Sequence, residues 1–84
     1  MTDLNKAINI GPVVAKNLQQ VGIHSLEELR DLGAENAFIR LREIDPGACI
    51  SCLMALEGAV RDIRWHHLPD DKKQELKAFL SMLK

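Results

Sequence analysis

"INIGPVVAKNLQQVGI", residues 8–23, decides the fold because it contains the signals that begin and end a short helix. Pro12 suits the first position of a helix, where its fixed φ is favourable and its missing N–H costs nothing. Gly22 supplies the left-handed residue that ends a helix, and it places Ile23 where a Schellman motif packs it on Leu18. The stretch therefore predicts a tight corner followed by a helix of about nine residues.

Apolar residues recur at helical spacing along the rest of the chain, and no stretch alternates with period two long enough to predict a strand. Ser25 and Glu28 have the spacing of a capping box, in which each side chain accepts a hydrogen bond from the free backbone N–H of the other residue. The pattern predicts an all-α, compact orthogonal bundle of five to six short helices. The further helices are expected at residues 3–8, 25–33, 34–45, 48–64 and 70–84. The expected inward-facing residues of the shorter helices and the last one are Leu4, Ala7, Ile8, Val14, Leu18, Val21, Leu26, Leu29, Leu32, Ala34, Ala37, Phe38, Leu41, Ile44, Leu76, Phe79, Leu80 and Leu83.

The helix expected at residues 48–64 has the widest apolar face. A face that wide predicts a central helix covered by its neighbours. Gly58 costs about 1 kcal/mol relative to Ala in an exposed helix interior, so we expect another helix, with the corner as one candidate, to approach it closely. The apolar stripe consists of Cys49, Leu53, Leu56, Val60 and Ile63.

Length and composition limit the classes of function. Eighty-four residues predict a single domain, residues 1–84, without a separate lobe for a small-molecule substrate. Eleven basic and twelve acidic side chains give a net charge of -1, which excludes the strongly basic balance of a dedicated duplex binder. No apolar run is long enough for a membrane span, and the N-terminus lacks the features of a signal peptide. We therefore expect a cytoplasmic protein with no membrane partner.

Three segments together resemble the C-terminal domain of the TfoX/Sxy competence regulators of bacteria. They are "IGPVVAKNLQQVGIHSLEELRDLGAENAF", "ALEGAVRDIRWHHLP" and "KKQELKAFL", and the similarity spans roughly residues 4–80. The resemblance implies a compact fold of about five helices, similar to helix–hairpin–helix and SAM-like domains, and a regulatory, non-enzymatic role. In the longer regulators this domain follows a separate N-terminal domain. Because Met1 lies only a few residues before the similarity begins, we expect a stand-alone domain.

The corner is the candidate site for nucleic acid. The N-terminus of a helix presents free N–H groups and a positive dipole end, which together attract a phosphate. No acidic residue occurs between residues 4 and 26, whereas six acids lie between residues 27 and 45. This charge asymmetry favours weak contact with a DNA backbone through Lys6, Asn9, Gly11, Val13, Val14 and Lys16.

Two departures from the DNA-binding form of this hairpin favour a packing corner instead. Asn9 takes the place of the first glycine, and Pro12 removes one N–H donor. A site with two or three phosphate contacts also binds weakly and loses affinity quickly as salt rises. The alternative function is therefore a protein–protein or self-association module with no nucleic-acid contact.

The remaining motifs predict neither catalysis nor a cofactor. "CISC" lacks the second ligand pair of a zinc site and the βαβ pattern of a thioredoxin-like pair, so Cys49 and Cys52 are interpreted as small buried hydrophobes. Trp65 is interpreted as a structural anchor. His66 and His67 have no nucleophile or acid that the sequence places beside them. The lysines of the last helix, Lys72, Lys73, Lys77 and Lys84, are interpreted as a solvated face.

Overall fold

The computed structural model describes residues 3–83, and this part of the chain is all-helical. Two single 3₁₀ turns and five α-helices follow one another without a strand, as predicted. The elements are η1 (Leu4–Lys6), α1 (Pro12–Gln20), α2 (Leu26–Leu32), α3 (Ala34–Ile44), α4 (Ile50–Arg61), η2 (Trp65–His67) and α5 (Asp70–Met82).

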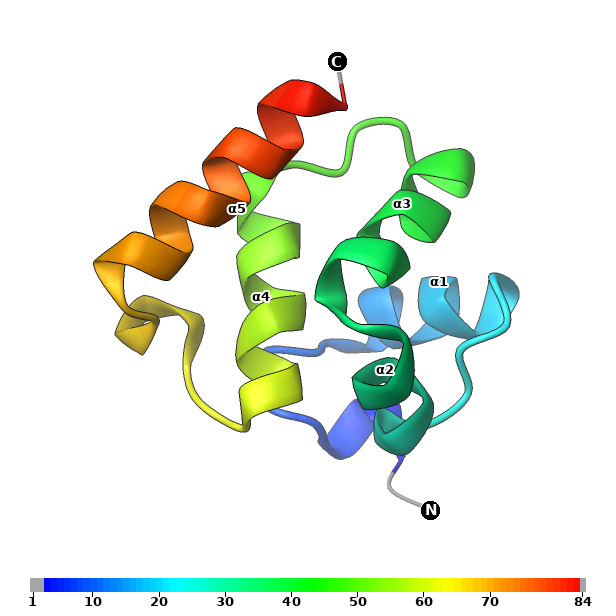
Figure 1. Ribbon diagram of the computed structural model, residues 1–84. Helices are drawn as coiled ribbons and strands as arrows, with labels where there is room; N and C mark the ends of the chain where they lie inside the picture. Colours follow the sequence, from blue (N-terminus) through cyan, green and yellow to red (C-terminus); the bar gives the residue numbers. More distant parts are fainter. Residues whose placement is uncertain (1–2, 84) are drawn as a thin grey trace.

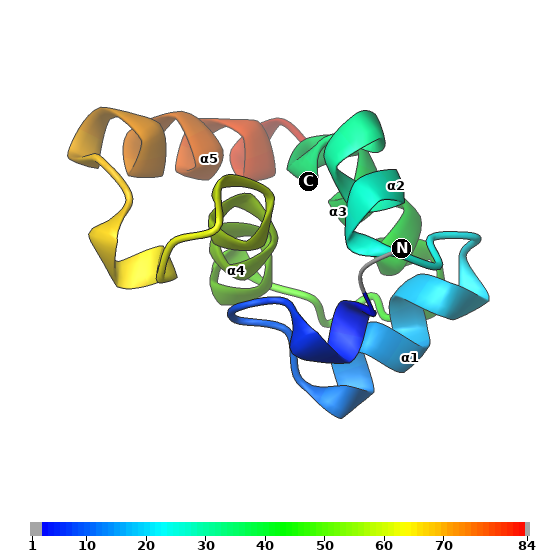
Figure 2. The same cartoon turned by 90° about the horizontal axis from the view of Figure 1, so that it is seen from below.

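Helix α4 occupies the centre of the bundle, as its wide apolar face predicts. It packs against α2, α3, α5 and η2 (Figure 1). Seen nearly end-on, α4 has α5, the α2–α3 pair and the N-terminal corner placed around it (Figure 2). Leu53, Leu56 and Ala59 are fully buried there, and the core continues through Phe38 of α3 and Leu76 of α5.

The predicted corner helix forms and ends as the sequence indicates. Pro12 takes its first position and Gly11 is the N-cap. Gly22 has a φ of 90°, and the Ile23 N–H donates to the Leu18 carbonyl at 2.9 Å, which is the hydrogen bond of a Schellman motif. Leu18 and Ile23 are both buried, so the closure also contributes to the core.

The segment before the corner differs from the prediction. Residues 3–8 do not form a helix of several turns, because η1 is one 3₁₀ turn that ends when Ala7 becomes extended. Leu4 and Ala7 are buried as expected, whereas Ile8 is only half-buried and Ile10 is buried instead. Without a full helix before the turn, the helix–hairpin–helix motif is not confirmed.

The capping box forms only in part. The Glu28 N–H donates to the Ser25 hydroxyl at 3.2 Å, as predicted. The Glu28 carboxylate, however, accepts from the His24 N–H at 2.7 Å rather than from that of Ser25. The reciprocal half of the capping box is therefore displaced by one residue, from Ser25 to His24.

Helix α4 is shorter at both ends than the 48–64 span expected. It ends at Arg61 because Asp62 adopts a left-handed φ of 60°, and the Ile63 N–H then donates to the Gly58 carbonyl at 2.9 Å. This closure has the same geometry as that of α1, with an aspartate in place of the glycine. An aspartate reaches this conformation less often than glycine, so the sequence signal for the helix end is weak.

Two residues assigned to the apolar stripes are exposed. Cys49 precedes α4 as its extended N-cap, so its side chain does not continue the stripe and is not a buried hydrophobe. Ile44 is the last residue of α3, where the chain leaves the core, and its side chain is 44% exposed. Both corrections concern helix ends, where a shift of one or two residues changes the direction of a side chain.

Candidate functional site

The corner is fixed to the C-terminal end of α4 through Asn9. This residue has a φ of 69°, a conformation that asparagine tolerates better than most residues. Its side-chain Nδ2 donates to the Ile63 carbonyl at 2.9 Å, and its Oδ1 accepts from the Trp65 N–H at 3.4 Å. Both polar atoms of the Asn9 side chain therefore bond to the turn between α4 and η2.

Gly58 makes this attachment possible. A Cβ atom at Gly58 would collide with Asn9 Nδ2 and would lie 2.6 Å from the Ile63 carbonyl oxygen. It would also lie 3.2 Å from the Trp65 backbone nitrogen. The predicted close approach at Gly58 is confirmed, although not by another α-helix: the approaching groups are the Asn9 side chain of the corner and the backbone of the turn after α4.

The other five candidate residues lie at or near the surface around the N-terminus of α1. Gly11 is exposed and, having no side chain, gives the helix no capping acceptor. Val13 is 72% exposed, Val14 is half-buried, and Lys6 and Lys16 are exposed. Because η1 packs against α1, the structure brings both lysines to the same region of the fold.

A further cation near the corner was missed by the sequence reasoning. The hydrogen bonds of Asn9 to Ile63 and Trp65 place exposed Arg64 beside the corner, 55 positions away in the chain. Asp62, also exposed, adds a negative charge to the same segment. No local pattern connects the two segments, so only the fold could reveal this neighbourhood.

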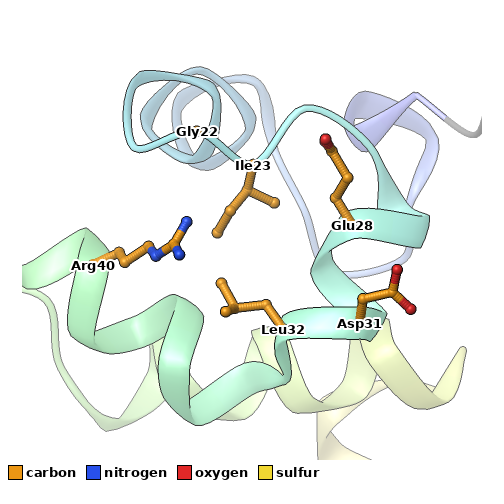
Figure 3. Close-up of a pocket in the computed structure, with 6 residues that line it drawn as sticks. All are labelled: Gly22, Ile23, Glu28, Asp31, Leu32 and Arg40. Carbon is orange, nitrogen blue, oxygen red and sulfur yellow. The ribbon is translucent and has the colours of Figure 1, made fainter.

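A separate open hollow of about 310 Å³ lies between the α1–α2 loop, α2 and α3 (Figure 3). Two of its charged side chains already bind the backbone: Arg40 Nη1 donates to the Val21 carbonyl at 3.4 Å, and Glu28 caps α2. These bonds close the ends of helices. We therefore interpret the hollow as a surface depression where the α1–α2 loop packs against α2 and α3, and not as a ligand site. Its lining residues are Gly22, Ile23, Glu28, Asp31, Leu32 and Arg40.

Glu57 is the one largely buried carboxylate within residues 3–83. Arg61 Nε donates to Glu57 Oε2 at 2.6 Å, and Lys72 Nζ lies 3.9 Å from Oε1. Lys72 belongs to α5, so the cluster connects α4 to α5. The predicted solvated face of α5 is therefore wrong at Lys72, whose side chain is only 18% exposed, and Lys73 is also half-buried. Lys77 is exposed as expected, and Lys84 lies outside the described residues.

The aromatic residue of η2 has the predicted structural role. Trp65 is half-buried against the core and stacks on His66 with ring centroids 3.9 Å apart. Lys73 Nζ donates to the His66 carbonyl at 3.0 Å, which ties η2 to α5. His66 and His67 are exposed, and no group of three or more His, Cys, Asp or Glu side chains within residues 3–83 could hold a metal ion.

The cysteines of "CISC" lie at the N-terminus of α4, at the opposite end from Gly58. Cys49 is exposed, Cys52 is half-buried, and both are free thiols. Cys52 packs against the core as expected. The expectation of burial is wrong for Cys49.

No helix within residues 3–83 is both long enough and apolar enough to cross a membrane.

No functionally curated protein matches the chain significantly. Two similar crystal structures come from Listeria monocytogenes, and neither points to a known catalytic family. One, of an uncharacterised protein in a triclinic form, is 46% identical with a TM-score of 0.95, covering 98% of this chain and 93% of that one. The other, of a protein of unknown function in a tetragonal form, is 47% identical with a TM-score of 0.93, covering 96% of this chain and 100% of that one.

The family comparison agrees with the sequence motifs and with the fold. The model of the TfoX C-terminal domain matches residues 1–80, which is nearly the whole chain. The corner, the central helix with Gly58 and the Trp65 turn all lie within the matched span. This chain belongs to the family of TfoX C-terminal domains.

Proposed function

We propose that this chain is a non-enzymatic, regulatory binding module that contacts the phosphate backbone of DNA weakly through the N-terminus of α1. One observation carries the proposal: the helix begins at exposed Gly11 without a side-chain cap, and exposed Lys6 and Lys16 precede and follow this start in the chain. The first N–H groups of a helix have no partner within it, so those of Val13 and Val14 can donate to an anion.

Because the Asn9 amide bonds to the turn after α4, we assign the phosphate contacts to the other candidate groups. These groups are two backbone N–H groups and two lysines, with Arg64 as a third cation close to the corner. A site of this size neutralises about two or three phosphates, so log K should fall with log salt with a slope of about -2 to -3. Such contacts read no base sequence, and affinity is expected to be independent of sequence.

The test is a fluorescence anisotropy titration of a labelled 20-base-pair duplex at low and moderate salt. Lys16→Glu is expected to weaken binding and to reduce the magnitude of the salt slope by about 1 or more. Lys77→Glu is the matched control, because Lys77 is exposed on α5 and the substitution changes the net charge equally. Absence of binding at low salt, or equal loss in both variants, contradicts the proposal.

A second candidate function is binding of a protein partner, and one observation favours it. A hollow of about 180 Å³ between α3 and the C-terminal end of α5 is lined by Ile39, Arg42 and Leu83. Ile39 is 40% exposed, and the neighbouring Met82 is 82% exposed. Apolar side chains grouped at a hollow are typical of protein contacts. Sedimentation across a concentration series tests self-association: Ile39→Glu should abolish any dimer, and a strictly monomeric wild type contradicts self-association.

A further inference from the structure

The two cysteines of "CISC" are held close together by the first turn of α4. The Cys52 N–H donates to the Cys49 carbonyl at 3.0 Å, and the Leu53 N–H donates to the same carbonyl at 3.2 Å. A turn closed by a bond between residues i and i+3 keeps their Cα atoms within about 7 Å. This separation is compatible with a disulfide, whose Cα atoms lie about 4.4–6.8 Å apart.

The surroundings of the two thiols differ in a way that gives them different reactivity. Cys49 is an exposed N-cap with no side-chain capping hydrogen bond, and the backbone N–H groups of Ser51 and Cys52 lower the pKa of its thiol. Cys52 is half-buried against the core, and the pKa of its thiol is raised from 9.0 to about 11, chiefly by burial. The nearby charges of Cys49 and Asp45 contribute the rest of this rise.

We propose that Cys49 and Cys52 form a thiol–disulfide exchange site, in which exposed Cys49 attacks a small-molecule disulfide and Cys52 resolves the product. The Cys49 thiolate attacks one sulfur of the disulfide, forms a mixed disulfide and releases one thiolate. The Cys52 thiol loses its proton to solvent and attacks the Cys49 sulfur, which releases the second thiolate. Two protein thiols are oxidised to one disulfide, and one small disulfide is reduced to two thiols.

The order of the two steps follows from the electrostatics of the pair. Cys52 is a poor first nucleophile because a thiol with a pKa of about 11 is almost entirely protonated at neutral pH. Once Cys49 is in a mixed disulfide it carries no charge, so its repulsion of the Cys52 thiolate disappears. The first step therefore promotes the second. This inference does not depend on the proposed DNA contact, which lies at the other end of α4.

The test uses 5,5′-dithiobis(2-nitrobenzoate) as the small disulfide, at neutral pH, with the reduced full chain. The wild type should release two equivalents of coloured thiolate, one for each cysteine, and end as a monomer about 2 Da lighter with no adduct. Cys52→Ala should release one equivalent and keep the adduct. Cys49→Ser should react at least about tenfold more slowly than Cys52→Ala, since the higher pKa of Cys52 outweighs its greater intrinsic nucleophilicity.

Two further measurements separate a tuned thiol from one that is merely accessible. Folded Cys52→Ala should react faster at pH 7 than the same variant in urea, where Cys49 has its ordinary pKa and is fully accessible. Circular dichroism establishes that both variants are folded. Three results would overturn the proposal: a stable double adduct in the wild type, a product linked between two chains, or equal rates for the two single-cysteine variants.

Discussion

The two ends of α4 differ in what their neighbours leave accessible. At the C-terminal end, the Asn9 side chain lies over Gly58 and bonds to Ile63 and Trp65, so the corner is closed onto the helix. At the N-terminal end, Cys49 is exposed and no side chain caps the helix. The closed end contains the motif that most resembles a ligand-binding hairpin, and the open end contains a motif interpreted from the sequence as buried packing. The comparison shows that tertiary contacts, and not the sequence of a motif, decide whether its side chains are free to bind or react.

The largest expected effect is at the closed end, from Gly58→Ala. The added Cβ collides with the Asn9 amide and with the backbone carbonyl of Ile63, which cannot move as freely as the end of a side chain. Overpacking should exceed the gain in helix propensity, for a net loss of about 3 kcal/mol in the free energy of unfolding. Urea denaturation measures it. Gly47→Ala is the control, since its Cβ would meet only Asp45 Oδ1, at 3.5 Å, and an unchanged stability of Gly58→Ala would contradict the close approach.

The next largest effect is expected from Asn9→Ala. The substitution removes both hydrogen bonds to the α4–η2 turn and places an alanine at a positive φ, for a loss of about 2 kcal/mol. Asn9→Gly keeps the backbone conformation and removes only the amide, so it should cost less in the same urea experiment. If Asn9→Ala costs nothing, the corner is not fastened to α4 through this side chain.

A smaller effect is expected at the open end, from the pH dependence of Cys52. Its thiol titrates at 9.0 when unfolded and at about 11 when folded, so between these values the unfolded chain binds fewer protons than the folded chain. The free energy of unfolding should therefore fall as pH rises from about 9 to about 11. Thermal unfolding at pH 8 and pH 10.5 should show a larger decrease in Tm for the wild type than for Cys52→Ala. An identical decrease in both would show that Cys52 is not desolvated in the fold.

The smallest effect is expected from Cys49→Ser. Serine is a preferred N-cap residue, and Cys49 makes no capping hydrogen bond, so the variant should gain about 0.5 kcal/mol. The change is measured by urea denaturation beside the Asn9 variants. A loss of more than about 1 kcal/mol would mean that the Cys49 side chain is packed, and the two ends of α4 would then not differ as described.

Features that depend on local chemistry were predictable from the sequence. The closure of α1 at Gly22 and Ile23 follows from neighbouring residues alone, and the close approach at Gly58 follows from a glycine within an apolar helix. The closure of α4 was missed because Asp62, unlike glycine, has no strong preference for the left-handed conformation. A capping position is also hard to separate from the helix that follows it, which is why Cys49 was assigned to the apolar stripe.

The candidate site was less predictable because its neighbours come from distant segments. Asn9 bonds to residues 54 and 56 positions away, and nothing in residues 8–16 indicates that its amide is used there. The same contacts bring Arg64 to the corner. The charges of Lys6 and Lys16 could be read directly, whereas the availability of each group to a ligand depends on the tertiary contacts of the corner.

The most direct test of the corner's closure onto α4 is a double-mutant cycle between Asn9→Gly and Gly58→Ala, measured by urea denaturation. Because the Asn9 amide is one of the groups that the new Cβ would meet, Gly58→Ala should cost about 1 kcal/mol less in the Asn9→Gly background than in the wild type. Part of its cost should remain, since the Ile63 carbonyl is still in the way. Costs that add to within about 0.3 kcal/mol would contradict the contact between Asn9 and Gly58, and with it the account of the corner as a closed joint.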